Sequence, residues 1–335
     1  MTACMYISPP WDPAWPNGAF VPVLLADTMV GLVGFEHEEP LIPIRGMSAE
    51  VYSTKLTRKL NIMGNCGVAL AGFGGPIRDA IWEIREHLAK PLPRERPMRP
   101  FAEYLTNYNK AAGGIVIEGL AALNLRGTIY HTNPKDTEMQ FRHFGRTCGI
   151  GSGRIDIYQY LIDYQNNLEK WDLRGVTAWM KANAFINHLN AMKLVNELRH
   201  GVENGWGGFV EWMYIPANEP AWRFGPSVLH VLIPNPSFDP ADDPALQEPR
   251  LLAYDQHIAG GAILTYSEKR YNYFHLPEIL EPRRVSGEEL SREWVDWQPD
   301  FIVLTCVNGR KHNYPIASKT LNPSERHFVD FRIDS

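Results

Sequence analysis

A threonine stands second in the chain, directly after Met1. Its hydroxyl group and its place near the N-terminus make it a candidate for a catalytic role. A residue as small as threonine permits removal of the initiator methionine, so that Thr2 would become the mature N-terminus. One residue would then carry both a hydroxyl and a free α-amine. Because an α-amine titrates at about pH 8, it can accept the hydroxyl proton near neutrality. The start of the chain therefore fits a nucleophile with its own base, although many proteins begin Met-Thr without such a role. The short apolar run that follows is unlike a secretory signal.

Apolar periodicity predicts the strands and helices that would position this residue. The strands expected up to residue 233 cover residues 1–7, 20–26 before Asp27, 51–61, 68–72, a hairpin at 115–125 and 128–131, then 141–144, 209–215 and 228–233. Helices are expected from Pro76, over 101–112, after a glycine-rich turn at 148–153, and within 177–199. This order favours two sheets with helix pairs outside them, a layered α+β domain.

Two of these helices have predicted apolar faces. The first would bury Ile77, Ala80, Ile81, Ile84 and Leu88, and the third would bury Ile155, Tyr158, Leu161, Ile162 and Leu168. Residues 9–18, 35–50 and 201–208 are rich in proline, acidic residues or glycine and are expected to be loops.

The last hundred residues have a different character. Residues 235–249 are rich in Pro and Asp and indicate a linker. Beyond the linker, strands are expected at 262–266, 271–275, 301–307 and 327–333, with a short helix near 287–297. We therefore expect one domain over 1–233 and a linker with a β-rich C-terminal extension over 234–335.

Composition excludes several classes of function. The 335 residues carry a formal net charge of −5 and are 44% hydrophobic, which gives no electrostatic case for binding nucleic acid or an anionic membrane. No apolar run approaches the roughly 20 residues that cross a bilayer. The four cysteines are far apart and fit a reducing cytoplasm. No metal or cofactor motif appears, and the histidines lack ligand spacing, so no cofactor is expected.

Four stretches in order resemble the proteasome β-subunit family, which includes the bacterial HslV-type proteasome homologues. They are residues 2–8, residues 23–27, residues 59–75 and the turn Gly151-Ser152-Gly153. The resemblance implies a four-layer αββα sandwich of the N-terminal-nucleophile (Ntn) hydrolases, here with the β-rich extension. The chain departs from the family in its longer loops, its expanded long-helix region and its C-terminal hundred residues. Trp206 also stands where a serine is usual.

The resemblance implies a role for three residues at the start of the site. Thr2 would attack an amide carbonyl and form an acyl-enzyme that water resolves. Lys59 would lie close to Thr2 and stabilise the deprotonated hydroxyl by its positive charge, and Asp27 would hold that lysine. Lys55, four residues earlier on the same strand face, is the alternative for this role. A solvated strand lysine and a strand-end aspartate are the structural readings of Lys59 and Asp27.

Three further positions have both a functional and a structural interpretation. The backbone N–H of Gly72 would be the oxyanion donor, or Gly72 is needed only for the turn into the first helix. Ser152 would bond the N-terminal amine or a catalytic water, or it caps the following helix. Glu203 aligns with the late aspartate of the family, or it is a surface carboxylate.

The resulting hypothesis is a cytoplasmic threonine peptidase or amidase that forms a homo-oligomeric ring and acts on peptide or other amide substrates. An ATP-dependent unfoldase is a possible partner by the same resemblance. The first alternative is a catalytically silent scaffold of the same fold, which the long insertions and Trp206 favour. The second alternative is a small-molecule amidase of the Ntn group, in which the C-terminal region closes a pocket.

Overall fold

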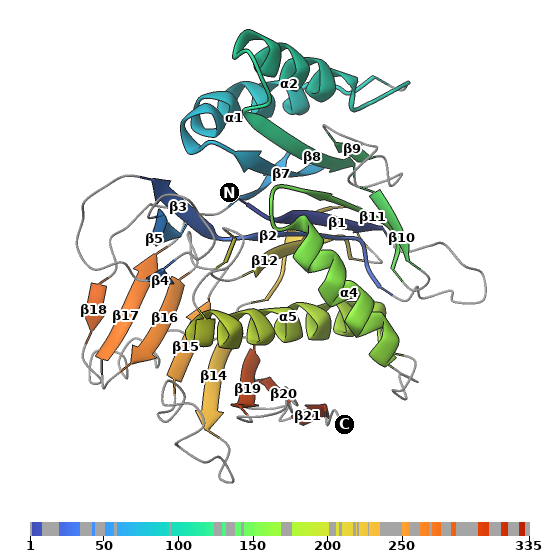
Figure 1. Ribbon diagram of the computed structural model, residues 1–335. Helices are drawn as coiled ribbons and strands as arrows, with labels where there is room; N and C mark the ends of the chain where they lie inside the picture. Colours follow the sequence, from blue (N-terminus) through green and yellow to red (C-terminus); the bar gives the residue numbers. More distant parts are fainter. Residues whose placement is uncertain are drawn as a thin grey trace.

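The computed structural model (Figure 1) has a mixed α+β fold in which two pairs of helices interrupt a series of strands along the chain. It describes residues 2–8, 20–33, 42–43, 51–56, 59–93, 95–123, 129–131, 138–141, 144–168, 176–200, 206–207, 210–216, 219, 221–226 and, beyond these, the strands between 228 and 331. None of the described helices is long and apolar enough to span a membrane.

A six-stranded antiparallel sheet carries the N-terminal strand at its centre. Its order is β10 (Glu138–Phe141), β11 (Gly145–Ile150), β1 (Cys4–Ser8), β2 (Val23–Asp27), β12 (Val210–Tyr214) and β13 (Arg223–Phe224). Cys4 lies between Ala26 of β2 and Ile150 of β11, and Val210 of β12 lies opposite Asp27. Residues from Cys4 to Ile7 are buried on both faces of the sheet, so this strand is covered from both sides.

A four-stranded antiparallel sheet packs against one face of the six-stranded sheet. Its order is β6 (Leu60–Met63), β7 (Cys66–Gly72), β8 (Ile117–Leu123) and β9 (Ile129–His131). The core between the two sheets includes Cys4, Tyr6, Leu24 and Ala26 from one side and Leu60, Ala69, Ala71, Leu120 and Ala122 from the other. Many of these side chains are small, which lets the two sheets approach closely.

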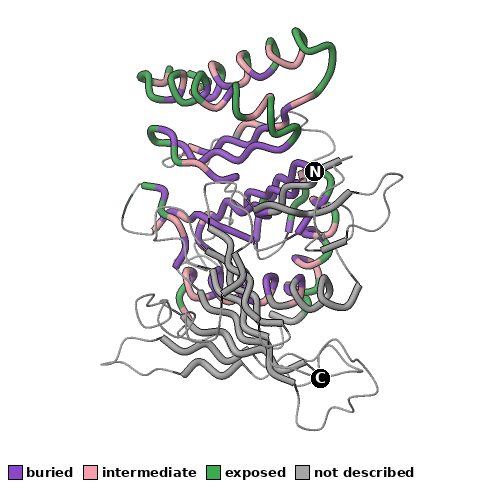
Figure 2. The backbone as a smooth tube through the Cα atoms, turned by 90° about the vertical axis from the view of Figure 1, so that its left-hand side faces the viewer, coloured by how far each residue is buried: buried purple, intermediate pink, exposed green. Residues whose placement is uncertain are grey.

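Helix pairs cover the outer faces of the two sheets (Figures 1 and 2). α1 (Gly74–Ala89) and α2 (Arg99–Ala111) pack on β7 and β8, and α4 (Arg154–Leu168) and α5 (Ala178–His200) pack on β1, β11 and β12. The apolar periodicity explains α1, which buries Ala80, Ile84 and Leu88 against the sheet as expected. The faces of α1 and α2 that point away from the sheet are largely exposed, as Figure 2 shows.

Two more sheets lie beside this layered body. β3 (Met29–Val33), β5 (Val51–Leu56) and β4 (Ile42–Pro43) form a three-stranded sheet. The C-terminal part forms an eight-stranded sheet of β18 (Arg283–Val285), β17 (Arg270–His275), β16 (Ala262–Ser267), β15 (Arg250–Tyr254), β14 (Val228–Pro234), β19 (Phe301–Val307), β20 (Ile316–Thr320) and β21 (Phe328–Phe331). β14, which the expected division assigns to the first domain, pairs within this sheet. The division itself stays a prediction.

Three local predictions are wrong. The single strand expected over 51–61 is two strands in different sheets, because the side chain and backbone of Lys59 are engaged in buried contacts where β6 begins. Residues 148–150 belong to β11 rather than to a turn, since they pair with β1. Ile155 is 67% exposed, because the buried face of α4 is centred on Ile157, Tyr158, Leu161 and Tyr164; Tyr158 and Leu161 are buried as expected.

Several predicted segments lie outside the described residues. These are the loop at 9–18, the insert at 35–50 apart from β4, most of the loop at 201–208, the linker at 235–249 and the short helix near 287–297.

Candidate active site

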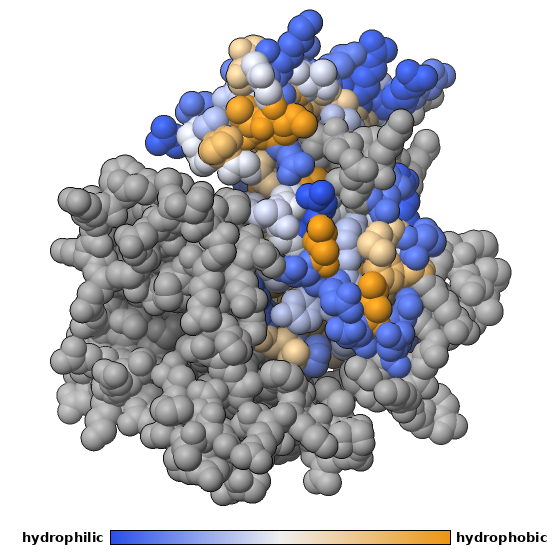
Figure 3. Space-filling model, in the orientation of Figure 1, coloured by the Kyte–Doolittle hydropathy of each residue, from blue (hydrophilic) through white to orange (hydrophobic). Residues whose placement is uncertain are grey.

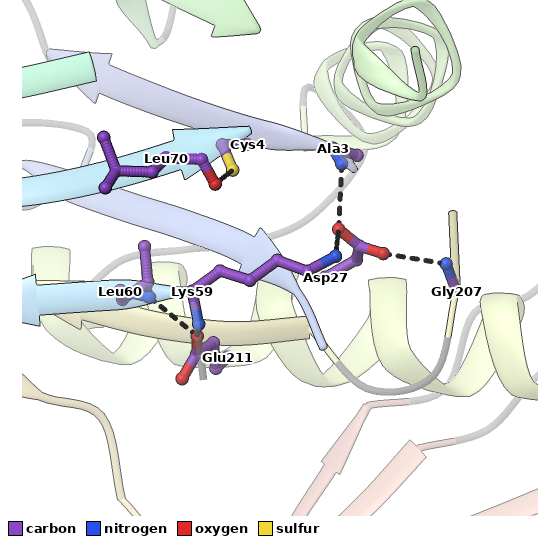
Figure 4. A network of polar contacts seen from close by, with 8 residues as sticks. All are labelled: Ala3, Cys4, Asp27, Lys59, Leu60, Leu70, Gly207 and Glu211. Atoms are coloured by element: carbon purple, nitrogen blue, oxygen red, sulfur yellow. Dashed lines mark hydrogen bonds and ion pairs between the residues drawn. The ribbon is translucent and has the colours of Figure 1, made fainter. Parts of the chain in front are cut away.

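A buried ion pair between Asp27 and Lys59 forms the centre of the candidate site (Figure 4). Lys59 Nζ lies 2.7 Å from Asp27 Oδ1, the aspartate is fully buried, and the lysine is 8% exposed. Asp27 ends β2, whereas Lys59 immediately precedes β6 in the other sheet. The ion pair therefore joins the two sheets at the end of the strand next to β1. Breaking such a buried pair by removal of one partner typically costs about 3–5 kcal/mol.

Backbone donors complete the environment of the Asp27 carboxylate. Ala3 N donates to Oδ1 at 2.8 Å, and Gly207 N donates to Oδ2 at 3.1 Å. In return, Asp27 N donates to Ala3 O at 3.0 Å. The carboxylate thus accepts one ammonium and two amide donors, the arrangement that a buried charge requires. It also fixes the position of the residue after Thr2.

Thr2 is held by the turn that precedes α4. Its carbonyl oxygen accepts a hydrogen bond from Gly153 N at 3.4 Å. Gly151 has φ +80°, and a Cβ built there would lie 1.9 Å from that same carbonyl oxygen. Only glycine fits both this backbone conformation and this close approach. Ser152 is exposed between the two glycines, and the turn that carries it is brought to Thr2 by the Gly153 hydrogen bond.

Trp206 closes the other side of this turn. It is fully buried, and its indole Nε1 donates to Asp156 Oδ2 at 2.6 Å. Lys193 Nζ lies 4.0 Å from the ring centroid, a cation–π contact. A Cβ at Gly153 would lie 2.3 Å from the indole, so the ring packs directly on the turn. Trp206, a departure from the resembled family, therefore packs against the same turn as Thr2.

Gly72 ends β7 with φ +134°, opposite Ile117 of β8. A Cβ there would lie 2.2 Å from the carbonyl oxygen of Val116, which accepts a hydrogen bond from Phe73 N. The structural reading of this glycine, a turn that only glycine can make, is thus sufficient to explain it. Gly72 is exposed, as are the large side chains of Phe73 and Ile115 beside it. On the face drawn in Figure 3, apolar surface occurs in separate patches among polar residues.

The two candidate lysines, Lys59 and Lys55, lie in different environments. Lys59 pairs with Asp27, whereas Lys55 lies in β5 opposite Val30 of the three-stranded sheet, where only the backbone is described. Glu203 lies outside the described residues. The candidates that the structure brings together are therefore Thr2, Asp27, Lys59 and the turn around Ser152.

Two carboxylates at the site, the buried Glu211 and the partly buried Glu118, were missed by sequence reasoning. Glu211 Oε1 accepts the backbone N–H groups of Lys59 and Leu60, and Glu118 Oε2 accepts Gly151 N at 2.8 Å. Each is the one charged residue of an otherwise apolar strand sequence, and this lone charge is the signal that could have marked it. The partners of the two carboxylates are distant in sequence and could not be found in this way.

Cys4 lies close to this charged cluster. Its Sγ is 3.9 Å from Leu70 O, and the side chain is fully buried. Burial raises the pKa of the Cys4 thiol well above its ordinary value, the positive charge of Lys59 opposes this, and Asp27, Glu211 and Glu118 add to it. The thiol is therefore neutral at pH 7. Among the described residues, no group of His, Cys, Asp and Glu could hold a metal ion.

Comparisons with known proteins give only distant likenesses. No family model matches the chain, and no curated protein matches it. Among solved structures, a Gly-1 mutant of Anbu from Hyphomicrobium sp. strain MC1 has a TM-score of 0.36 at 12% identity, covering 67% of this chain and 85% of that one. Eukaryotic HslV from Trypanosoma brucei has a TM-score of 0.34 at 12% identity, covering 63% and 97%.

Anbu, an ancestral beta-subunit, from Yersinia bercovieri has a TM-score of 0.40 at 12% identity, with 66% of this chain and 86% of that chain covered. At TM-scores this low, none of these likenesses carries an argument about function. The chemistry must be inferred from the site itself.

Proposed function

We propose that the chain is a threonine Ntn hydrolase that cleaves peptide or other amide bonds through an acyl-enzyme on Thr2, after removal of Met1. The observation that supports this most directly is the bridging role of Asp27. One carboxylate oxygen accepts both Lys59 Nζ and the N–H of Ala3, the residue next to Thr2. The buried ammonium and the amide of the residue after Thr2 thus share one carboxylate oxygen, and positive charge near the Thr2 hydroxyl would favour formation of an alkoxide.

In the proposed reaction the Thr2 hydroxyl oxygen attacks the carbonyl carbon of the amide, and the α-amine of Thr2 accepts the hydroxyl proton. The carbonyl oxygen becomes an oxyanion, for which the N–H of Gly72 is the proposed donor. Collapse breaks the C–N bond, and the leaving amine takes the proton. Water then hydrolyses the ester on Thr2 and restores the hydroxyl. Ser152 is the proposed partner of the amine or of that water, and Glu203 the proposed late carboxylate.

The layering of the described elements supports an αββα sandwich as the framework of this site. Two sheets pack face to face, and a helix pair covers each outer face. The homo-oligomeric ring, the cytoplasmic location and an ATP-dependent unfoldase as partner rest on the resemblance given above. They belong to the proposal with the peptidase activity.

The first experiment measures the intact mass of the purified protein. A mass lower by one methionine residue leaves Thr2 with a free amine. The same protein is then treated with a peptidyl β-lactone, which acylates a nucleophilic hydroxyl as its ring opens. We expect one adduct that maps to Thr2, and none in Thr2→Ala. An adduct formed equally in Thr2→Ala, or full amide hydrolysis by that variant, would exclude Thr2 as the nucleophile.

A catalytically silent scaffold is the second candidate, and the burial of Thr2 favours it. Thr2 is only 4% exposed, whereas a nucleophile must meet its substrate. The scaffold candidate predicts retained Met1, no adduct, and an oligomeric state that Thr2→Ala leaves unchanged. A small-molecule amidase would instead give the adduct but hydrolyse small amides and spare peptides.

A further inference from the structure

Glu211 lies inside the protein, where a carboxylate is costly without partners. The residue belongs to β12 of the six-stranded sheet and is fully buried. Its Oε1 accepts two consecutive backbone N–H groups, those of Lys59 at 2.5 Å and Leu60 at 2.9 Å (Figure 4). These donors stand where β6 begins. A carboxylate that accepts two amide donors recovers much of the free energy that its burial costs.

The position of β6 explains why this contact matters. β6 is the edge strand of the four-stranded sheet and pairs only with β7 among the described strands. The N–H groups at its start would be buried without acceptors if Glu211 were an apolar residue, at about 1–3 kcal/mol for each group. The Glu211 side chain thus attaches the start of β6 to the opposite sheet. Lys59 is the residue that is fixed by this attachment.

β12 itself is anchored at this point. The side chain of Asn190 on α5 accepts Val210 N at 2.7 Å and donates to Val210 O at 3.2 Å. Val210 lies opposite Asp27, and Glu211 lies opposite Ala26. The strand that pairs with Asp27 is therefore the one that holds the backbone of Lys59. The backbone amide of Lys59 is held by Glu211 of β12, and its ammonium is held by Asp27 of β2, so two paired strands position both groups.

We propose that Glu211 is a positioning residue for Lys59, which sets the lysine backbone so that Nζ reaches Asp27 beside Thr2. This inference rests on the proposed function, because it assigns a catalytic consequence to the position of Lys59. Glu211 touches neither a substrate nor the reacting atoms in this scheme. It acts through the backbone N–H groups of Lys59 and Leu60.

The test compares Glu211→Gln, which keeps one acceptor oxygen, with Glu211→Ala, which keeps none. Glu219→Gln is the matched control, since Glu219 is an exposed carboxylate that pairs with Arg223. Hydrolysis of fluorogenic peptide amides is measured for each variant, together with hydrogen exchange of individual amides by NMR. Displacement of a catalytic group by about 1 Å can cost about a hundredfold in rate.

We expect kcat of Glu211→Ala to fall about tenfold to a hundredfold with KM nearly unchanged, because the lysine is displaced while substrate contacts remain. Glu211→Gln and Glu219→Gln should keep a kcat near the wild-type value. The amides of Lys59 and Leu60 should exchange faster in Glu211→Ala alone. If that variant does not fold, Glu211→Met replaces it, because methionine fills the space without offering an acceptor.

A wild-type kcat or unchanged exchange of the Lys59 and Leu60 amides in the variant without an acceptor would overturn the proposal. A Glu211→Gln variant as impaired as Glu211→Ala would also overturn it. The proposed function fails separately, if the wild-type protein neither hydrolyses amides nor forms the β-lactone adduct. In that case the amide exchange still decides whether Glu211 holds the start of β6.

Discussion

The α-carbon of Gly151 lies against the carbonyl oxygen of Thr2, with no room for a side chain between them. A Cβ there would be 1.9 Å from that oxygen, and the residue has φ +80°. Gly113 at the end of α2 has a similar φ of +77° but has no atom within 4 Å of its Cβ position. The two glycines therefore separate the effect of backbone strain from the effect of contact with Thr2.

We expect Gly113→Ala to cost about 1–2 kcal/mol of unfolding free energy, because an L-residue is strained at positive φ. Gly151→Ala should cost more, since Thr2 must also move, and it should slow acylation of Thr2 by the β-lactone. Urea unfolding and the rate of adduct formation measure the two effects. Equal losses of stability in the two variants, with wild-type acylation in both, would contradict the contact.

Lys59 and Lys55 should differ sharply on substitution. Lys59→Met leaves the buried Asp27 carboxylate without its cation, at about 3–5 kcal/mol, and removes the charge next to Thr2. Lys55→Met should leave amide hydrolysis close to the wild-type rate. Urea unfolding and steady-state kinetics check both variants. Loss of activity in Lys55→Met with activity retained in Lys59→Met would reverse the assignment of the two lysines.

The ion pair itself can be tested by a double-mutant cycle. Asp27→Asn and Lys59→Met each remove one charge, so the double variant should lose less free energy of unfolding than the two single losses together. A coupling of about 0.5–3 kcal/mol is typical of residues in contact. Strict additivity in denaturant unfolding would show that the two side chains do not interact in solution.

Trp206 should stabilise both the turn at Thr2 and the loop at Asp27, because Gly207 follows it. Trp206→Phe keeps a ring on Gly153 but removes the donor to Asp156, a loss of about 1.5–3 kcal/mol for a bond to a charged group. Trp206→Ala should cost about 3–5 kcal/mol by leaving a cavity. Trp82 is 65% exposed, so Trp82→Ala is the control and should change thermal stability little. Equal thermal midpoints in all three variants would contradict this role.

We expect the protein to lose stability in acid because of His188 on α5. Burial lowers the pKa of His188 from 6.5 to about 4, and its Nδ1 has no hydrogen-bond partner within the described part of the chain. Between pH 4 and pH 6.5, His188 therefore binds a proton in the unfolded chain but not in the folded chain. The stabilising contribution is complete above pH 6.5 and is lost as pH falls toward 4, by about 3 kcal/mol at most. The slope of unfolding free energy against pH should flatten in His188→Gln, and an unchanged slope would contradict the assignment.

Local patterns in the sequence predict an element correctly where its buried residues recur at one regular spacing. The α1 helix is an example, since its spacing of Ala80, Ile84 and Leu88 alone indicates the buried face. The single strand expected over 51–61 is wrong, because the alternation of apolar and polar residues continues although β5 and β6 belong to different sheets. Only a tertiary contact, from Glu211 to the amides of Lys59 and Leu60, marks the break.

The candidate site was predicted in part for the same reason. Lys59 and Asp27 were selected by resemblance, and their contact spans 32 positions in the chain. Glu211 lies 152 positions from Lys59, within the otherwise apolar strand Val210–Tyr214. Its lone charge could have marked it as unusual, but the amides of Lys59 and Leu60 that it binds cannot be identified from the local sequence.

The parallel pairing of β14 with β19 has a consequence for synthesis of the chain. β14 can pair with β15 soon after both leave the ribosome, but its other edge is filled only by residues 301–307. Until then the nascent chain presents an open strand edge at what becomes the middle of the sheet, and such edges recruit other chains. A fragment ending near residue 233 would lack both β15 and β19 and would leave both edges of β14 unpaired. The safer place to shorten the protein is therefore before Val228, where β14 begins.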